Sequence, residues 1–345
     1  MSQVKVLPMH TPIITSYPTH ANTLSCVMRY QDSVRWFYEQ YIQLFGGKDF
    51  SISCYLDFYA PIPWKSCPWL DYQKVSPELV AQKWDSIVDF IVAALDLEYY
   101  VLLYLDSFYV PASINFQNFH LAHDTFIFGY NLAEKILWAA DFYGNSRKYR
   151  QAPIGFSQTA AAYQKAAVSP RTDFINGIVL LKPIPFDGPS FNLSTMVALL
   201  KEYLAAKTTK GYSDGYRKDV EKEKELWVFG TEVYQLLQEY LEFQLKEQPQ
   251  YPDLRSFHVL YEHKKLMSER IAYCSQHQLL KNAALILKES REIEQQAFML
   301  RNMMIKNMVR RNESLIQRAI SLIPELRQKE KNMIEILLDN ICVQI

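Results

Sequence analysis

The stretch His123–Phe142, HDTFIFGYNLAEKILWAADF, contains two apolar runs separated by the more polar segment Asn131–Lys135. Both runs are rich in aromatic and aliphatic residues, a composition typical of strands that bury one or both faces. The pattern predicts an antiparallel β-hairpin with its turn at Asn131–Lys135. His123 then opens the first strand and Asp141 closes the second, so the two side chains are expected to face each other.

Other short apolar runs surround this hairpin and are interrupted by Pro and Gly. They are SISCYLDFYAP at 51–61, EYYVLLYLD at 98–106 and FINGIVLLKP at 174–183, and they are predicted to be strands. A helix is predicted between the first two runs, because Ser76 can cap its start and Pro77 suits its first position. This mixture of strands and helices predicts an α+β domain over residues 1–190.

The second half of the chain has a different pattern. Apolar residues recur every three or four positions in long segments after about residue 225, as on one face of a helix. Such apolar faces must be covered by other helices, so an all-α antiparallel bundle is predicted over residues 191–345. Pro324 is expected to break or restart the last helix.

Composition limits the classes of function. The 345 residues include 37 Lys and Arg and 37 Asp and Glu, so no net charge draws the chain to nucleic acid or an acidic membrane. The N-terminal segment lacks the apolar core of a signal peptide. The most apolar stretch, residues 86–106, carries Asp89, Asp96 and Glu98 in its interior and predicts a helix followed by a strand. Five scattered cysteines without a C-x-x-C pair favour a reduced, cytoplasmic protein.

Cys26 lies in HANTLSCVMRYQDSVRWFYEQY, His20–Tyr41, where the pattern predicts that a helix begins. The N-terminus of a helix carries partial positive charge and unpaired N–H groups, which lower the pKa of a thiol and can hold an oxyanion. Cys26 is therefore a candidate nucleophile. The alternative is that Cys26 is a small buried apolar residue, as free cysteines usually are.

A nucleophilic cysteine needs a base and a group that orients the base. Among the seven histidines, His120 and His123 lie directly before an apolar strand, where a base would have little freedom. His123 is the predicted base, and Asp141 is predicted to orient its ring. A metal site is not expected here, because Asp124 should point away from His123 as the strand alternates. No glycine-rich nucleotide-binding loop is present.

The segment Leu103–Asn131, LYLDSFYVPASINFQNFHLAHDTFIFGYN, resembles the butirosin biosynthesis protein H family, which is similar to papain-like peptidases of the bacteriocin-processing type. In that family an acidic residue and an aromatic-proline turn precede a histidine-rich stretch, an apolar strand and a Gly-Tyr turn. The resemblance covers about residues 15–185, and an appended helical region is usual in the family. The matching residues are Asp106, Phe108, Tyr109, Pro111, His120, His123, Gly129, Tyr130 and Asn131.

The resemblance implies a papain-like domain with a triad of Cys26, His123 and Asp141. It also implies an activity. Family members in antibiotic and thiotemplated peptide pathways take an acyl group from a carrier-protein thioester and pass it to an amine, and the closthioamide amide synthetase is a related enzyme. The acyl group would be carried on phosphopantetheine and pass through acyl-Cys26, with no bound cofactor. Substrate contacts are expected at four of the matching residues, Asp106, Tyr109, His120 and Tyr130.

The chain departs from the papain-like pattern just before Cys26. Such enzymes usually place a Gln there to donate to the oxyanion, and this chain has His20, Ala21 and Asn22. Asn22 is the candidate donor, and His20 is the alternative at this place.

Two other classes of function stay open. The same three residues could serve a cysteine peptidase that trims a leader peptide, or the chain could be a non-catalytic scaffold that binds a partner. A basic run between Arg301 and Arg318 predicts a docking surface for an acidic carrier protein, or alternatively a solvated helix face. Neither nucleic acid nor a membrane is an expected partner.

Overall fold

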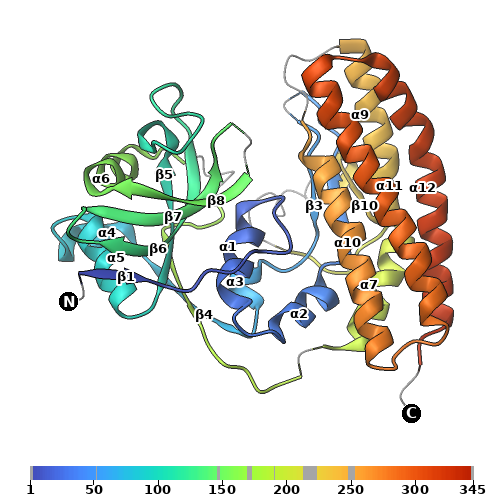
Figure 1. Cartoon of the computed structure of the whole chain (residues 1–345), viewed down its shortest axis with the longest axis horizontal. Helices are drawn as coiled ribbons and strands as arrows, with labels where there is room; N and C mark the ends of the chain where they lie inside the picture. Colours follow the sequence, from blue (N-terminus) through green and yellow to red (C-terminus); the bar gives the residue numbers. More distant parts are fainter. Residues whose placement is uncertain are drawn as a thin grey trace. The chain divides into compact units, whose positions relative to one another are not determined.

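The computed structural model describes residues 3–51, 53–145, 148–168, 173–189, 191–212, 224–247 and 253–342. The chain is α+β, with 51% helix and 19% strand, and its C-terminal region is helical. None of the described helices is long and apolar enough to cross a membrane. Figure 1 shows the elements with the labels used below.

The chain forms two compact units. Unit 1 contains the chain up to Val34 and Ile62–Gly188, and unit 2 contains Arg35–Pro61 and most of the chain after Gly188. The predicted boundary at residue 190 lies next to the third point at which the chain passes from one unit to the other, after Gly188. The segment Arg35–Pro61, which the sequence pattern placed in the first domain, lies in unit 2.

Unit 1 is built on an antiparallel sheet with the strand order β4-β9-β5-β6-β7-β8, and β1 pairs with one end of β6. The strands are β1 (Val4–Val6), β4 (Leu70–Val75), β5 (Tyr100–Asp106), β6 (Ala122–Asn131), β7 (Ile136–Tyr143), β8 (Lys148–Gly155) and β9 (Ile178–Pro183). The central strands are almost completely buried, which explains why their sequences read as continuous apolar runs.

The predicted hairpin is confirmed as β6 and β7. Its register pairs Phe126 with Ala140, and an irregularity follows Ile127. The carboxamide oxygen of Asn131 accepts hydrogen bonds from the first backbone N–H groups of the turn, which is the usual role of Asn in such turns. A Cβ on Gly129 would lie 2.8 Å from the carbonyl oxygen of Lys5, so glycine allows β1 to approach β6 at this point.

The helices of unit 1 pack on this sheet: α5 and α6 contact β5, and α1 contacts β6 and β7. The predicted helix start at Ser76 is confirmed, because its hydroxyl accepts from the backbone N–H of Leu79. The apolar stretch at 86–106 is also confirmed as a helix followed by a strand. The helices are α1 (Pro18–Val27), α3 (Pro63–Ser66), α4 (Pro77–Lys83), α5 (Ile87–Asp96) and α6 (Phe156–Lys165).

Unit 2 contains the long helices, and in Figure 1 α9 to α12 lie side by side. Short connections join α10 to α11 and α11 to α12, which makes these neighbours antiparallel as predicted. Helix α12 continues through Pro324, so the predicted break at this residue is wrong. The helices are α2 (Ser33–Gln40), α7 (Leu193–Leu204), α9 (Val233–Glu247), α10 (Arg255–Gln276), α11 (Ala283–Arg310) and α12 (Glu313–Asp339).

Unit 2 is not all-α, and the sequence-based prediction is wrong on this point. A three-stranded antiparallel sheet joins β2 (Leu44–Gly47), β3 (Leu56–Phe58) and β10 (Trp227–Phe229). Two of its strands come from Arg35–Pro61, far ahead of the helices, so no local pattern in the second half could reveal the sheet. An aromatic cluster around Phe45 and Tyr59 packs on it.

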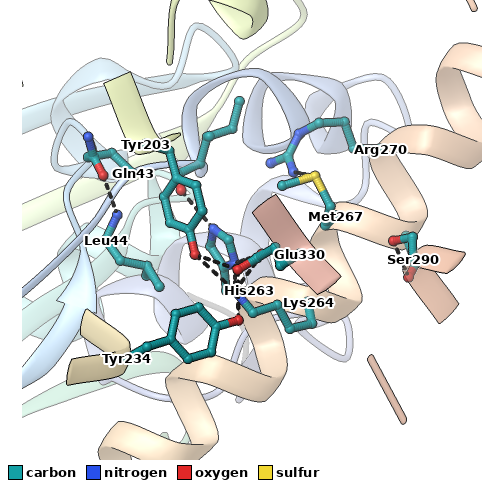
Figure 2. Close-up of polar contacts among 12 residues, drawn as sticks. Gln43, Leu44, Tyr203, Tyr234, His263, Lys264, Met267, Arg270, Ser290 and Glu330 are labelled. Carbon is teal, nitrogen blue, oxygen red and sulfur yellow. Dashed lines mark hydrogen bonds and ion pairs between the residues drawn. The ribbon is translucent and has the colours of Figure 1, made fainter. Parts of the chain in front are cut away.

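A buried polar network connects four helices of unit 2 (Figure 2). Glu330 of α12 accepts hydrogen bonds from Lys264 of α10 at 2.6 Å, Tyr203 of α7 at 2.8 Å and Tyr234 of α9 at 2.7 Å. The Lys264 ammonium also donates to Nδ1 of His263 at 3.0 Å. Burial, more than any other cause, lowers the pKa of Lys264, and the Glu330 carboxylate opposes that shift.

His263 extends the network to the chain before β2. Its Nε2–H donates to the carbonyl oxygen of Ile42 at 2.7 Å. Burial and the Lys264 charge hold the pKa of His263 well below its usual value, so the ring is neutral and Nδ1 accepts from Lys264. Each charged group in this cluster is therefore hydrogen-bonded, which is the condition for a buried ion pair to be tolerated.

Glu330→Leu leaves the Lys264 ammonium buried without its counter-charge. We expect the free energy of unfolding to fall by about 3–5 kcal/mol, as measured by urea denaturation. Adding Lys264→Met should recover part of the loss, because no buried charge then remains. The control is Glu325→Leu on the exposed side of α12, where the pair with Lys329 at 2.7 Å is solvated and the loss should be about 0.5 kcal/mol or less. A double variant no more stable than Glu330→Leu would contradict this account.

Candidate acid–base site

His123 and Asp141 form a hydrogen-bonded pair in unit 1. Nδ1 of His123, at the start of β6, lies 2.8 Å from Oδ2 of Asp141, near the end of β7. The Asp141 side chain is 8% exposed and the His123 side chain 33% exposed, so the carboxylate is enclosed while the ring reaches solvent. Oδ1 of Asp141 also accepts from the backbone N–H of Phe142 at 2.6 Å. The pairing predicted from the hairpin is confirmed.

This geometry determines what the imidazole can do. Asp141 accepts the Nδ1 proton, so the tautomer of neutral His123 has its basic lone pair on Nε2. The enclosed carboxylate stabilises the imidazolium that forms when Nε2 takes a proton. A histidine held in this way is suited to general-base catalysis.

Asp124 is a member of the site that the sequence pattern missed. Strand alternation suggested that its side chain would point away, but Oδ1 of Asp124 lies 4.0 Å from Nδ1 of His123. The residue is 7% exposed, and its Oδ2 is buried without a hydrogen-bond partner among the described residues. Burial raises the pKa of Asp124 to about 7, and the charge of Asp141 acts in the same direction while that of His123 opposes it. The only sequence signal was the consecutive His-Asp at a strand start.

Cys26 does not lie at a helix start, and the prediction that it does is wrong. Helix α1 begins at Pro18, which occupies its first position, and Cys26 is the ninth of its ten residues. Its thiol is completely buried and donates to the carbonyl oxygen of Thr23 in the same helix at 3.2 Å. Burial raises the pKa of the Cys26 thiol far above its usual value. The C-terminal end of a helix also disfavours a thiolate, because its partial charge is negative.

Asn22, the predicted oxyanion donor, is buried within α1. Its Oδ1 accepts from the hydroxyl of Tyr149 on β8 at 2.9 Å, and the same hydroxyl lies 3.2 Å from Oγ of Ser25. Asn22 therefore helps to hold α1 on the sheet. Its Nδ2 is buried and has no hydrogen-bond partner among the described residues, and the role of Asn22 as an oxyanion donor stays a prediction.

A second His-Asp pair lies one strand away. Nδ1 of His120 is 2.7 Å from Oδ2 of Asp106, which is buried at the end of β5. Oδ1 of Asp106 accepts the backbone N–H groups of Phe108 and Leu121, at 3.1 and 3.2 Å. The His120 ring stacks on Phe108 at 4.1 Å and its side chain is 61% exposed. This pair was anticipated as substrate-binding residues but not as a pair.

The other two predicted substrate contacts differ in placement. Tyr109 lies beside His120, with ring centroids 6.0 Å apart. Tyr130 is completely buried, and its hydroxyl donates to Asp96 of α5 at 2.6 Å. That leaves Tyr130 no surface for the predicted substrate contact, and its role is to hold α5 against β6.

A groove of about 390 Å³ lies in unit 2, along α9 and α12. Its lining includes the cations Arg327 and Lys331 and three glutamines, but no His, Cys, Asp or Glu. It can therefore supply hydrogen bonds and positive charge but no group that exchanges protons near neutral pH. In unit 1 the two His-Asp pairs lie at the ends of β5, β6 and β7.

Iodoacetamide should label Cys342 before Cys26. Cys342 is partly exposed, whereas the Cys26 thiol is buried, and only an accessible thiolate reacts. Peptide mass spectrometry of timed samples gives the rates, and labelling in urea confirms that Cys26 is chemically competent. Faster labelling at Cys26 than at Cys342 in the folded protein would contradict this placement.

The raised pKa of Asp124 predicts a pH-dependent stability. Between pH 4 and pH 7 the folded protein holds a proton on Asp124 that the unfolded chain has lost. The free energy of unfolding should therefore fall as pH rises through this range, by up to about 4 kcal/mol. Asp124→Asn removes this dependence, so its stability relative to the natural protein should increase from pH 4.5 to pH 7.5 in urea denaturation. For the exposed Asp85→Asn the same difference should stay flat; a flat difference for Asp124→Asn would refute the prediction.

No protein-family model matches this chain, and no curated protein is significantly similar to it. A function must therefore be argued from the site itself, in which His123 is bonded to Asp141 and approached by Asp124.

Proposed function

We propose that unit 1 is a papain-like acyl-transfer domain that forms amides, with His123 as its general base. The observation that carries this proposal is the 2.8 Å contact between Nδ1 of His123 and Oδ2 of Asp141. Two further features support it. The histidine opens one strand and the aspartate closes the next, and helix α1 packs against both strands. This is the arrangement that the family resemblance leads one to expect.

The proposed reaction is attack of an amine on a thioester. The amine nitrogen bonds to the thioester carbonyl carbon, and its proton passes to Nε2 of His123. The carbon–sulfur bond then breaks, and the departing sulfur takes the proton back from His123. The products are an amide and a free thiol, and Asp141 stabilises the transient imidazolium.

The proposed acyl donor is a phosphopantetheine thioester on an acidic carrier protein. The predicted docking surface is the basic run on α11 and α12, where Lys306, Arg310, Arg311 and Arg318 are exposed. Arg301 is different: its guanidinium lies over the rings of Tyr261 and Phe298, at 5.4 and 5.5 Å. The first four residues therefore carry the charge of the proposed surface.

The burial of Cys26 affects which of two routes the acyl group takes, through acyl-Cys26 or directly to the amine. In the route through acyl-Cys26, the thiolate must first attack the thioester, but this thiol is enclosed and its pKa is raised. His123 can instead activate the amine directly, which needs no cysteine. The geometry favours this direct route. A leader peptidase would use the same base with a peptide bond as acyl donor and water as acceptor.

The burial of Cys26 also favours a second candidate function. If neither Cys26 nor His123 meets a substrate, unit 1 serves as a scaffold that binds its partner without turnover. This candidate predicts carrier-protein binding in the absence of any amide product.

The test measures amide formation from an acyl-loaded carrier protein, and from an acyl N-acetylcysteamine thioester, with a panel of amines. His123→Gln should lower turnover by roughly 10²–10⁴-fold, because the general base is lost. His277→Gln replaces an exposed histidine of unit 2 and should leave turnover unchanged. Cys26→Ala should retain turnover by the direct route, with no acyl adduct by intact mass.

Three outcomes would count against this account. Turnover that survives His123→Gln removes the proposed base. Loss of turnover in Cys26→Ala, together with an acyl adduct on the natural protein, establishes the covalent route instead. Binding of the carrier protein without any amide product supports the scaffold.

A further inference from the structure

Oδ2 of Asp124, which lacks a hydrogen-bond partner among the described residues, calls for an explanation that the proposed reaction does not supply. A buried polar atom without a hydrogen bond is costly, and native proteins contain few of them. Oδ2 of Asp124 is such an atom among the described residues, although the residue is only 7% exposed. It also adjoins the proposed base. Two carboxyl groups thus approach the same nitrogen, Nδ1 of His123: Asp141 at 2.8 Å and Asp124 at 4.0 Å.

The side chains near Asp124 are neutral or screened by solvent, so Asp124, Asp141 and His123 interact strongly with one another. Tyr104, its partner in the β5–β6 register, and Tyr149 on β8 both have raised pKa values, mainly through burial, and stay neutral. The Cys26 thiol is neutral for the same reason. Arg150 faces Asp141 in the β7–β8 register and is exposed, so solvent screens its charge. His123, Asp141, Tyr104 and Tyr149 interact electrostatically with Asp124. Arg150 and Tyr143 neighbour Asp141, Cys26 neighbours Tyr149, and Asp173 neighbours Tyr104.

We propose that Asp124 is a positioning residue that sets the proton affinity of His123 through its own protonation state. When Asp124 is neutral, Asp141 is the only carboxylate beside Nδ1, and His123 releases its proton readily. When Asp124 is ionised, a second negative charge 4.0 Å from the ring holds the proton on His123. The two groups therefore titrate as a coupled pair rather than independently.

The direction of the coupling follows from charge. Ionised Asp124 raises the pKa of His123, and protonated His123 lowers the pKa of Asp124 by the same free energy. Because burial brings the pKa of Asp124 into the neutral range, changes of pH near neutrality alter the charge beside the His123 ring. Asp124 would then tune how much of the enzyme is ready to accept a proton from an amine. This consequence rests on the proposed acyl transfer, but the coupling does not.

The experiment is an NMR titration of the whole chain with ¹³C-labelled histidine, in which His123→Gln assigns the His123 signal. In the natural protein the His123 curve should show two steps. Asp124→Asn should reduce it to one step, centred lower by about one pH unit, since opposite charges at 4–6 Å shift a pKa by one unit or more. Asp124→Glu keeps the charge and should keep two steps.

Asp106→Asn is the matched control. It neutralises a buried aspartate on the neighbouring strand that pairs with His120, so it should move the His120 curve and leave that of His123 unchanged. An unaltered His123 curve in Asp124→Asn would overturn the proposal. If that variant does not fold, a single-step His123 curve in the natural protein overturns it equally.

The same titration separates this proposal from the proposed function. If amide formation occurs, the pH at which turnover rises should shift downward in Asp124→Asn by the amount seen in the NMR curve. If the chain proves to be a scaffold, there is no turnover to measure. The NMR curves then still show whether the titrations of Asp124 and His123 are coupled. A turnover shift without a change in the His123 curve would also overturn it.

Discussion

The candidate site depends on one hydrogen bond, from Nδ1 of His123 to Oδ2 of Asp141. That bond exists because the hairpin register brings the start of β6 beside the end of β7. A shift of one residue would turn one of the two side chains to the other face of the sheet. The turn at Asn131 and the close approach of β1 at Gly129 hold that register. The chemistry of unit 1 is thus a consequence of strand pairing.

Two buried carboxyl groups in this chain differ in how many hydrogen bonds they accept. Glu330 in unit 2 accepts from one ammonium and two phenols, so its charge is fully compensated and it connects helices. Asp124 in unit 1 has an oxygen without any partner among the described residues and a pKa raised to about 7. A buried charge with all its hydrogen bonds stabilises one packing of the helices around it. A buried carboxyl that lacks hydrogen bonds has a shifted pKa, so its protonation responds to pH and to neighbouring charges. The comparison is the reason for regarding Asp124 as functional.

Cys26 shows how sensitive a reactivity argument is to the exact position of a helix end. The same residue would be an activated nucleophile in the first turn of a helix, yet near the last turn it is an inert, buried thiol. Pro18 begins α1 well before the position that an activated Cys26 would require. The family resemblance and the local electrostatics therefore disagree about this residue, while they agree about His123 and Asp141.

Local sequence patterns were sufficient to predict much of the structure of this protein. Apolar runs with a polar turn predicted the hairpin, Ser76 and Pro77 predicted the start of α4, and the helical periodicity predicted the antiparallel helices of unit 2. The hairpin pattern alone was enough to pair His123 with Asp141. Each of these features depends on residues close together in the chain, or on one turn, so the sequence carries the whole signal.

Tertiary structure decided what depends on distant partners. The sheet of unit 2 joins β2 and β3 to β10, which lies far away in the chain, and neither segment is long enough to identify its partner. Burial decided the protonation of Cys26 and Asp124, because desolvation is set by every element packed around a group. The sequence by itself determined the β6–β7 hairpin, the start of α4, the long helices of unit 2 and where the histidine-aspartate pair lies. Only the packing of those elements decided which acids and thiols keep their protons. The free energy of burying the charged form depends on the groups packed around a residue and not on the residue alone.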